Sequence, residues 1–360
     1  MPAARRLLTT GLAALVAIGL AAGCSRAQES TTPTSPAAAG PAAELRLGYF
    51  PNVTHAPALI GVAQNYFAEE LGAGTKLTTQ TFNAGPEEVN ALLGGSLDAG
   101  FIGSSPAINA FAKSNGEAVR LISGSTSAGA QLVTTPDITT PEQLKGKTIA
   151  TPQAGNTQDV ALKKWLKQNN LEIGAGPDKV TVQNIDNSKT LDLFKTGQVA
   201  GGWLPEPWSS RLVDAGAKVL VDEKSLWPGG QFPTTVLIVR TDFLNQHPQT
   251  VEALLRGTQK AVDFATSTPD QAKKITNDSI KQITNSALAQ PVLDRAFTEL
   301  NFDTDPLAAT FPQLSKDSVT AGATQKETDL HGFVDVIPLN TVRQAEGKPP
   351  VDAAGLDKKG

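Results

Sequence analysis

The chain has 360 residues, of which 40% are hydrophobic and 18% charged, as in ordinary water-soluble globular proteins. Its formal net charge is -4 at pH 7 and no run of Lys and Arg occurs beyond the extreme N-terminus, which excludes proteins that hold nucleic acid by its phosphate backbone. A chain of this length predicts two domains or one unit with two lobes.

Residues 1–24 have the pattern of an export signal. Arg5 and Arg6 supply a positive start, residues 7–20 are apolar, and small residues lead to Cys24. The apolar run is too short for a membrane-spanning helix. Cys24 is the only cysteine of the chain, so the mature protein is predicted to have no disulfide, no cysteine-based metal site and no cysteine nucleophile.

The ending LAAGC resembles the lipobox of bacterial lipoproteins, except that Leu20 stands one place earlier than in that pattern. The resemblance implies that Cys24 is lipidated and that the protein is extracytoplasmic, anchored to the outer face of the cell membrane or periplasmic. The alternative is a signal peptide that is cut elsewhere and discarded with Cys24. Residues 25–43 are rich in Ser, Thr, Pro and Ala, which predicts a disordered tether.

Strands and helices alternate from Glu44 to Thr241, which predicts an α/β architecture with mainly parallel sheets. Beyond Thr241 we expect helices and no further strand; residues 247–267 form the first of these helices. The expected strands are Leu45–Phe50, Lys76–Phe82, Ala99–Ile102, Val119–Ser123, Ala130–Thr134, Thr148–Thr151, Val180–Asn184, Gly201–Leu204, Lys218–Val221 and Val236–Arg240.

The stretch TTPEQLKGKTIAT contains Gly146 followed by Lys and Thr, as in phosphate-binding loops. Pro141 stands where such a loop needs its first glycine, and a strand follows instead of a helix. The stretch fits a short helix better. Thr140 and Gln143 form a capping box, Pro141 takes the first helical position, and Gly146 ends the helix.

Three turns after predicted strands carry hydroxyl or amide side chains where a helix begins. Such helix starts present free amides to an anion, and ligands of α/β proteins bind at the carboxyl ends of strands. In one of them Ser105 is the expected N-cap and Pro106 the first helical residue; the alternative is that Ser105 only caps its helix. Together the turns predict a cleft for one small polar, anionic ligand. Their residues are Asn52, Thr54 and His55; Gly103 to Pro106; and Gly155, Asn156 and Thr157.

A fourth stretch, AGGWLPEPWSSRLVDAG, concentrates Trp203, Glu206 and Trp208 between two prolines. Aromatic side chains on a stiff loop suit the apolar part of a ligand. The alternative is that each tryptophan is an ordinary core residue.

These stretches, together with LRLGYFPN, FNAGPEEVNALL and VLIVRTDFLNQHPQTVEALL, resemble the periplasmic or lipid-anchored substrate-binding proteins of ABC importers for aliphatic sulfonates, nitrate and taurine. The resemblance runs from Leu45 to Leu255. It implies a two-lobed type II periplasmic-binding fold with a ligand cleft between the lobes, a monomer, and a membrane permease as partner. The boundaries it implies are residues 44–129 and 234–360 for lobe one and residues 130–233 for lobe two.

The resemblance also implies the positions that bind the ligand, and no metal or cofactor. The implied ligand-binding positions are Asn52, Thr54, His55, Gly85, Ser104, Ser105, Gly155, Asn156, Thr157, Trp203, Glu206 and Trp208. A carboxylate beside an anion weakens binding unless a partner such as Arg211 holds it. We therefore predict that Glu206 is structural, orients the segment from Trp203 to Trp208, and that the ligand is an aliphatic sulfonate. Nitrate, taurine and a thiamine-precursor pyrimidine are the alternatives.

An enzyme on the same fold is the rival class. The related thiamine-pyrimidine synthase relies on a cysteine cluster, which this chain lacks. Among the three histidines only His55 lies in the predicted cleft, so no Ser/His/Asp set is apparent. We expect a binding protein and no catalysis.

Overall fold

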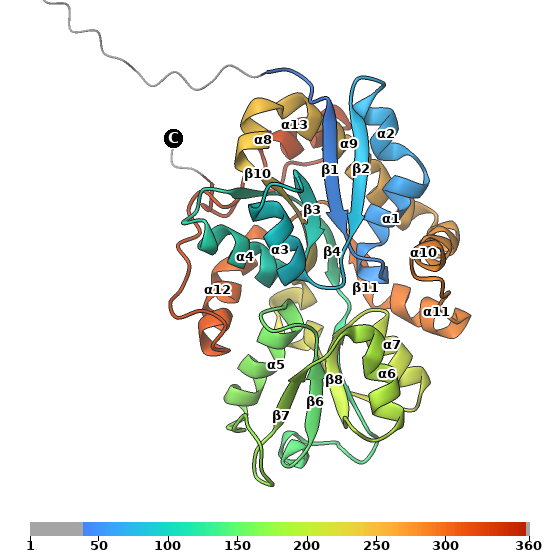
Figure 1. The fold of residues 1–360 in the computed structure, drawn as a ribbon, viewed down its shortest axis with the longest axis vertical. Helices are drawn as coiled ribbons and strands as arrows, with labels where there is room; N and C mark the ends of the chain where they lie inside the picture. Colours follow the sequence, from blue (N-terminus) through green and yellow to red (C-terminus); the bar gives the residue numbers. More distant parts are fainter. Residues whose placement is uncertain (1–38, 358–360) are drawn as a thin grey trace, which may run out of the picture. The chain divides into compact units, whose positions relative to one another are not determined.

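The computed structural model describes residues 39–357, which form two mixed sheets with helices packed around them (Figure 1). The first sheet has six strands and the second has five. The α/β fold class predicted from the sequence is confirmed. Cys24 and most of the predicted tether lie outside the described residues.

The first sheet combines strands from early and late parts of the chain. Its strand order is β11 (Leu300–Phe302), β4 (Val119–Ala128), β10 (Pro233–Arg240), β3 (Ala99–Ile102), β1 (Glu44–Tyr49) and β2 (Lys76–Thr81). The helices of the early part are α1 (Ala56–Ala63), α2 (Tyr66–Leu71), α3 (Gly85–Leu93) and α4 (Ser104–Lys113), and η1 (Val53–His55) is a single 3-10 turn. The late helices are α8 (Thr241–Gln246), α9 (Pro248–Ser267), α10 (Pro269–Thr284), α11 (Gln290–Thr298), α12 (Phe311–Thr320) and α13 (Ile337–Ala345), with the 3-10 turn η5 (Ala308–Thr310).

The second sheet is continuous in sequence. Its strand order is β7 (Thr181–Asn184), β6 (Thr148–Thr151), β8 (Gly201–Pro205), β5 (Ala130–Thr134) and β9 (Lys218–Asp222). Its helices are α5 (Thr157–Gln168), α6 (Asn187–Lys195) and α7 (Trp208–Asp214), and its 3-10 turns are η2 (Pro141–Leu144), η3 (Glu223–Leu226) and η4 (Pro228–Gly230). The boundaries predicted for the two lobes stay a prediction.

The expectation of mainly parallel sheets is wrong. Among the described strands, four neighbouring pairs are parallel and five are antiparallel. In the first sheet, β10 runs antiparallel to β3 and β4, and β11 runs antiparallel to β4. In the second sheet, β5 runs antiparallel to β8 and β9. Strand β11 also contradicts the expectation that no strand follows Thr241. The sequence did not indicate it, because a strand of three residues, paired only with β4, is too short to show a pattern.

Strand β4 runs five residues beyond its predicted end at Ser123. Ser125 and Thr126 are polar but buried, so the sequence lacks the apolar pattern that the strand's burial implies. The capping box is confirmed: the Thr140 N–H donates to Gln143 Oε1 over 3.0 Å at the start of η2, and Gly146 follows with φ +74°. None of the helices within residues 39–357 is long and apolar enough to cross a membrane.

Separate apolar cores stabilise the two sheets. One cluster gathers Leu45, Phe101, Ile238 and Phe333 around the first sheet. A second cluster beside the second sheet contains Trp165 and Trp203, whose rings meet edge to face with centroids 6.1 Å apart.

Candidate functional site

A small cavity of about 30 Å³ lies where strands of both sheets end and helices begin. Its residues follow β1, β2, β3, β6 and β7, end β8, or belong to β10, so most of them stand at the carboxyl ends of strands, as predicted. The lining residues are Phe50, Asn52, Thr54, His55, Asn83, Gly103, Asn156, Thr157, Gln158, Asn187, Pro205, Thr234 and Thr235. None of them is an Asp, Glu, Lys or Arg.

His55 is a neutral hydrogen-bond donor in this cavity. Its Nδ1 accepts from the Phe50 N–H over 3.2 Å, and its ring stacks on the Phe50 ring with centroids 4.3 Å apart. Burial lowers the pKa of His55 to about 3, so the imidazole carries no charge at neutral pH. A neutral imidazole that accepts at Nδ1 carries its proton on Nε2, which leaves the Nε2–H free to donate.

Asn52 also keeps its donor for the cavity. The Thr54 hydroxyl donates to Asn52 Oδ1 over 2.6 Å, and both side chains are buried. This bond occupies the amide oxygen just before η1. The Asn52 Nδ2 group, with two N–H bonds, is left for a ligand.

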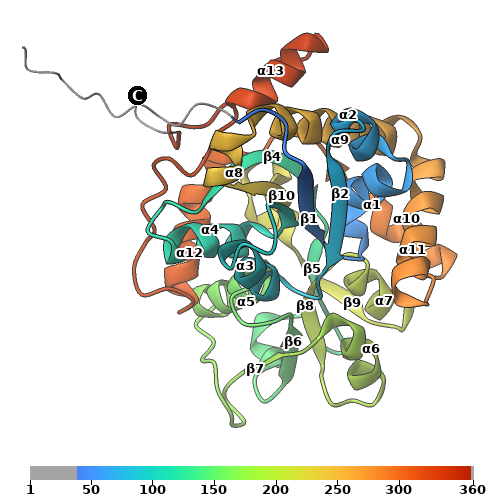
Figure 2. The same cartoon turned by 45° about the horizontal axis from the view of Figure 1, so that its top comes forward.

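The start of α5 reaches the starts of two helices of the first sheet. Asn156 Oδ1 accepts from the Gly85 N–H of α3 over 3.2 Å, and Thr157 Oγ1 accepts from the Ser105 N–H of α4 over 3.3 Å. Figure 2 shows α4 beside α3 and α5, in line with these bonds. The contact requires Gly103, because a Cβ atom there would lie 2.7 Å from Thr157 Oγ1.

These bonds give the cavity a single chemical character. The acceptor atoms of Asn52, His55, Asn156 and Thr157 are used inside the protein, and their N–H or O–H groups remain. The Thr235 hydroxyl has no hydrogen-bond partner within residues 39–357 and is a further donor, whereas the unpartnered Asn187 Oδ1 is an acceptor. A site rich in neutral donors binds an anion, and each bond to a charged group contributes about 1.5–3 kcal/mol.

The structure places the other predicted serines and glycines behind this surface. Helix α4 begins at Ser104 with Gly103 as its N-cap, so the prediction that Ser105 is the N-cap and Pro106 the first helical residue is wrong. The hydroxyls of Ser104 and Ser105 are buried without a partner in the described chain and do not line the cavity. Ser105 contributes its backbone N–H instead, as Gly85 does.

Gly155 shapes the start of α5. It has φ +81°, a left-handed conformation that favours glycine, and its N–H donates to Asp159 Oδ2 over 2.9 Å. Asp159 is completely buried and also pairs with Lys163. Gly155 therefore holds the turn that positions Asn156 and Thr157, without lining the cavity itself.

The two tryptophans of the fourth stretch also lie away from the cavity. Trp203 is completely buried and its Nε1–H donates to Glu223 Oε2 over 2.7 Å. Trp208 is half-buried, with the Arg211 guanidinium 5.1 Å from its ring centroid. This placement favours the core alternative for both side chains over the aromatic wall.

Glu206 is buried and paired, but not with Arg211. Its Oε1 accepts from Arg295 Nη1 over 3.0 Å and its Oε2 from the Ser210 N–H over 3.2 Å. Burial raises the pKa of Glu206, while the Ser210 and Arg295 contacts oppose that shift. Arg295 lies 89 positions away in sequence, so no local pattern indicates this partner.

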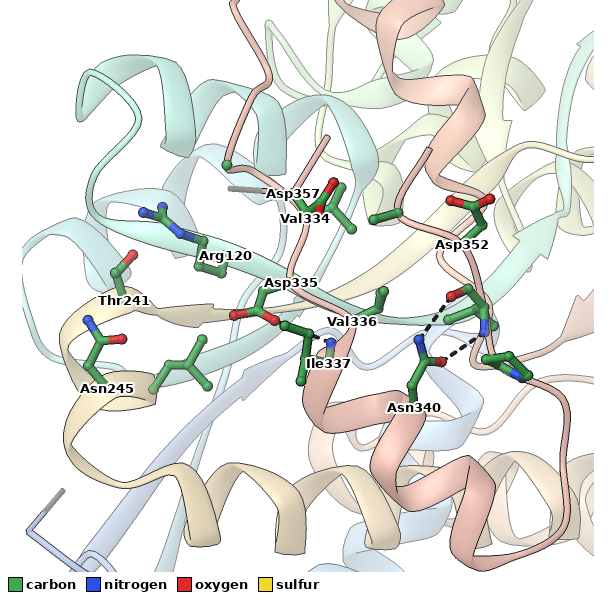
Figure 3. A pocket seen from close by; sticks show the side chains of 15 residues that line it. Arg120, Thr241, Asn245, Val334, Asp335, Val336, Ile337, Asn340, Asp352 and Asp357 are labelled. Carbon is green, nitrogen blue, oxygen red and sulfur yellow. Dashed lines mark hydrogen bonds between the residues drawn. The ribbon is translucent and has the colours of Figure 1, made fainter. Parts of the chain in front are cut away.

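A larger cavity of about 660 Å³ lies between β4, α8 and the C-terminal segment (Figure 3). Asn340 fixes one side of it by donating to the Val351 carbonyl over 3.0 Å and accepting from the Val351 N–H over 2.8 Å. Asp335, Asp352 and Asp357 contribute three carboxylates against the single guanidinium of Arg120. This net negative charge disfavours an anion, in contrast to the small cavity.

The sequence reasoning missed several lining residues. Asn83 directly follows β2 and Asn187 begins α6 after β7, so the strand–turn–helix pattern used for the other turns would have found both. Thr234 and Thr235 lie within β10, where no signal distinguishes them from other strand residues.

Known proteins support the family suggested by the sequence. The model of the NMT1-like family matches residues 38–278, more than half of the chain. The taurine-binding periplasmic protein of Escherichia coli is 30% identical over 59% of this chain and 64% of its own length, so this chain aligns with just under two thirds of that relative.

Solved structures with the same fold include two periplasmic binding proteins. The alkanesulfonate-binding protein SsuA of Xanthomonas axonopodis, bound to MOPS, has a TM-score of 0.64 at 20% identity over 82% of this chain and 98% of its own. The nitrate-binding protein NrtA of Synechocystis has a TM-score of 0.68 at 14% identity over 84% of this chain and 89% of its own. The two-lobed periplasmic-binding fold is thus confirmed, and the chain belongs to the NMT1-like family.

Proposed function

We propose that the protein is the extracytoplasmic substrate-binding component of an ABC importer and captures a small organic anion, an aliphatic sulfonate, in the small cavity. The observation that carries this proposal is that four lining side chains use their acceptors internally and keep their donors. Relatives named for taurine, alkanesulfonate and nitrate binding support an anion as ligand. A membrane permease would be the partner that receives the ligand, and we expect the binding protein to act as a monomer.

The charge of the cavity supports a simple sulfonate over taurine. A sulfonate carries one permanent negative charge spread over three acceptor oxygens, which suits neutral donors from several directions. Taurine adds an ammonium group, and no carboxylate lines the cavity. Glu206, the one acidic residue among the predicted ligand-binding positions, is completely buried and paired with Arg295.

Nitrate and bicarbonate form the second candidate class. A cavity of about 30 Å³ holds little more than one water molecule, so nitrate or bicarbonate would need less widening of the cavity than a sulfonate would. A thiamine-precursor pyrimidine fits less well, because Phe50 is the single aromatic carbocycle among the lining residues and it already stacks on His55.

Calorimetry on the purified protein tests the proposal with ethanesulfonate, butanesulfonate, taurine, nitrate, bicarbonate and a hydroxymethylpyrimidine. We expect the sulfonates to bind most tightly and each bound anion to raise the melting temperature, because a ligand selective for the folded state stabilises it. Tightest binding of nitrate or bicarbonate would assign the second class. Binding of the pyrimidine alone would contradict an anion site.

The site also supports binding over catalysis. His55 is the one histidine in the cavity, and a pKa of about 3 makes it a weak general base at neutral pH. Within residues 39–357, no group of three or more His, Cys, Asp and Glu side chains is arranged to hold a metal ion. The relatives and structures named above are binding proteins.

The proposed location includes a lipid anchor at Cys24, supported by the lipobox-like sequence alone. Replacement of Cys24 by Ala should release the protein from the membrane fraction. Equal retention of both forms in cell fractionation would contradict the anchor.

A further inference from the structure

Arg295, on the helix α11 that packs on the first sheet, contacts three segments that belong to the second sheet and its helices. Arg295 Nη1 donates to Glu206 Oε1 over 3.0 Å and to Ser210 Oγ over 2.7 Å. Its Nη2 donates to Gln131 Oε1 over 2.6 Å. These partners lie just after β8, on α7 and on β5, whereas α11 packs its Leu293 and Ala296 into the core of the first sheet.

The receiving site is specific for a guanidinium. Glu206 is completely buried, and its second oxygen is held by the Ser210 N–H. Three acceptors in different directions match the planar fork of an arginine, which a lysine ammonium does not reproduce. Such an ion pair adds little net stability, because desolvation of the two charges offsets their attraction.

Two further ion pairs join the late helices to the second-sheet unit. Directly after α11, Glu299 Oε2 lies 2.9 Å from Lys224 Nζ of η3. On α12, Asp317 Oδ2 lies 3.3 Å from Lys164 Nζ of α5. Figure 1 shows α11 beside α7 and α12 beside α5, on opposite sides of the molecule, as the packing of these helices requires.

The Arg295 contact also borders the anion cavity. Pro205, which precedes Glu206, lines that cavity, and the Glu206 N–H donates to the carbonyl of Gly129 over 2.9 Å at the passage between the sheets. A shift of α11 against Glu206 would therefore move both the wall of the cavity and the connection on which the sheets are joined.

We infer that Arg295 is a positioning residue for ligand capture: it sets the orientation in which the second sheet presents Pro205, Asn156 and Thr157 to the first. The inference rests on the proposed function for its effect on affinity. The effect of Arg295 on the orientation of the two sheets does not depend on which ligand binds. Arg295 touches the protein at Glu206, Ser210 and Gln131 and acts on the ligand through them.

The test compares Arg295→Lys, Glu206→Gln and the double variant with wild type, all in a Cys24→Ser background. Asp294→Asn is the control, because Asp294 neighbours Arg295 on α11 but pairs with Lys273 on α10. Spin labels on cysteines introduced at the exposed positions Lys113 and Lys195 report the distance between α4, beside the first sheet, and α6, beside the second, by double electron–electron resonance. Calorimetry with ethanesulfonate and nitrate reports affinity, and urea unfolding reports stability.

We expect Arg295→Lys and Glu206→Gln each to broaden or shift the distance distribution of the unliganded protein and to weaken anion binding at least tenfold. The double variant should be no weaker than the worse single variant, because both remove one contact. Asp294→Asn should change neither readout.

A distance distribution equal to wild type in a folded Arg295→Lys variant would overturn the inference, whatever the affinity. Affinity and stability that fall in step, with an unchanged distance in the folded fraction, would likewise assign Arg295 a merely structural role. If neither probe anion binds wild type but the distance shifts, the proposed ligand class fails and the positioning of the sheets stands.

Discussion

The sequence predicts that both the turn before α5 and the stretch from Trp203 to Trp208 bind the ligand, yet the structure uses them differently. Asn156 and Thr157 line the small cavity and contact helix starts of the first sheet. Trp203 and Glu206 are completely buried among partners of the protein itself, Glu223 and Arg295. Here the polar residues that begin α5 line the cavity, whereas Trp203 and Glu206 are held by contacts within the protein.

Among the replacements that test this difference, Trp203→Ala should lower the free energy of unfolding the most. Loss of a fully buried tryptophan leaves a cavity, so we expect the free energy of unfolding to fall by about 3–5 kcal/mol in urea titrations. Trp208→Ala, which removes a half-buried ring, is the control with a smaller expected loss. A Trp203→Ala variant that keeps its stability and loses only ligand binding would restore the aromatic-wall interpretation.

The partner of Trp203 should make stability depend on pH. Burial raises the pKa of Glu223 from its ordinary value of 4.5 to about 7. The folded chain then holds a proton that the unfolded chain releases, so this contribution is present below pH 4.5 and is lost as the pH rises to about 7. Relative to Glu223→Gln, wild type should lose on the order of 3 kcal/mol across this window.

Urea titrations of both forms at several pH values measure this difference. A gap between wild type and Glu223→Gln that stays constant from acid to neutral pH would show that the pKa of Glu223 is the same in the folded and unfolded chain, so that burial does not favour its protonated form.

On the cavity side, Asn156→Ala and Thr157→Ala should each weaken anion binding about tenfold, equivalent to 1.4 kcal/mol, with little change in melting temperature. Ser105→Ala is the matched control, because alanine keeps the N–H that Ser105 donates to Thr157. We expect it to change affinity less than twofold. Equal losses in all three variants would show that the Ser105 hydroxyl also contacts the ligand.

The smallest expected effect concerns His55. Because its pKa is about 3, the affinity for ethanesulfonate should stay constant between about pH 5.5 and 8.5 in calorimetric titrations. An affinity that strengthens as the pH falls through about 6.5 would mean that His55 binds the anion as a cation.

Local patterns made part of the site predictable. Asn52, His55, Asn156 and Thr157 were found because a strand, a polar turn and a helix follow one another within a few residues. The same pattern marks Asn83 and Asn187, which were overlooked. For such residues the neighbouring sequence carries the information.

Long-range contacts made the rest unpredictable. The pairing of Arg295 with Glu206 joins residues 89 positions apart, and the antiparallel place of β10 between β3 and β4 depends on where the chain returns from the second sheet. In the segment GGWLP, Trp203 is flanked by glycines and apolar residues. This pattern is equally compatible with a core strand and with the edge of a site.

A crystal structure of the protein with the anion that binds most tightly in calorimetry would test the central claim most directly. We predict that the anion oxygens lie within hydrogen-bonding distance of Nδ2 of Asn52 and Nε2 of His55 on one side and of Asn156 and Thr157 on the other. An anion bound instead by a Lys or Arg side chain, or in the cavity beside Arg120 and Asn340, would contradict recognition by neutral donors.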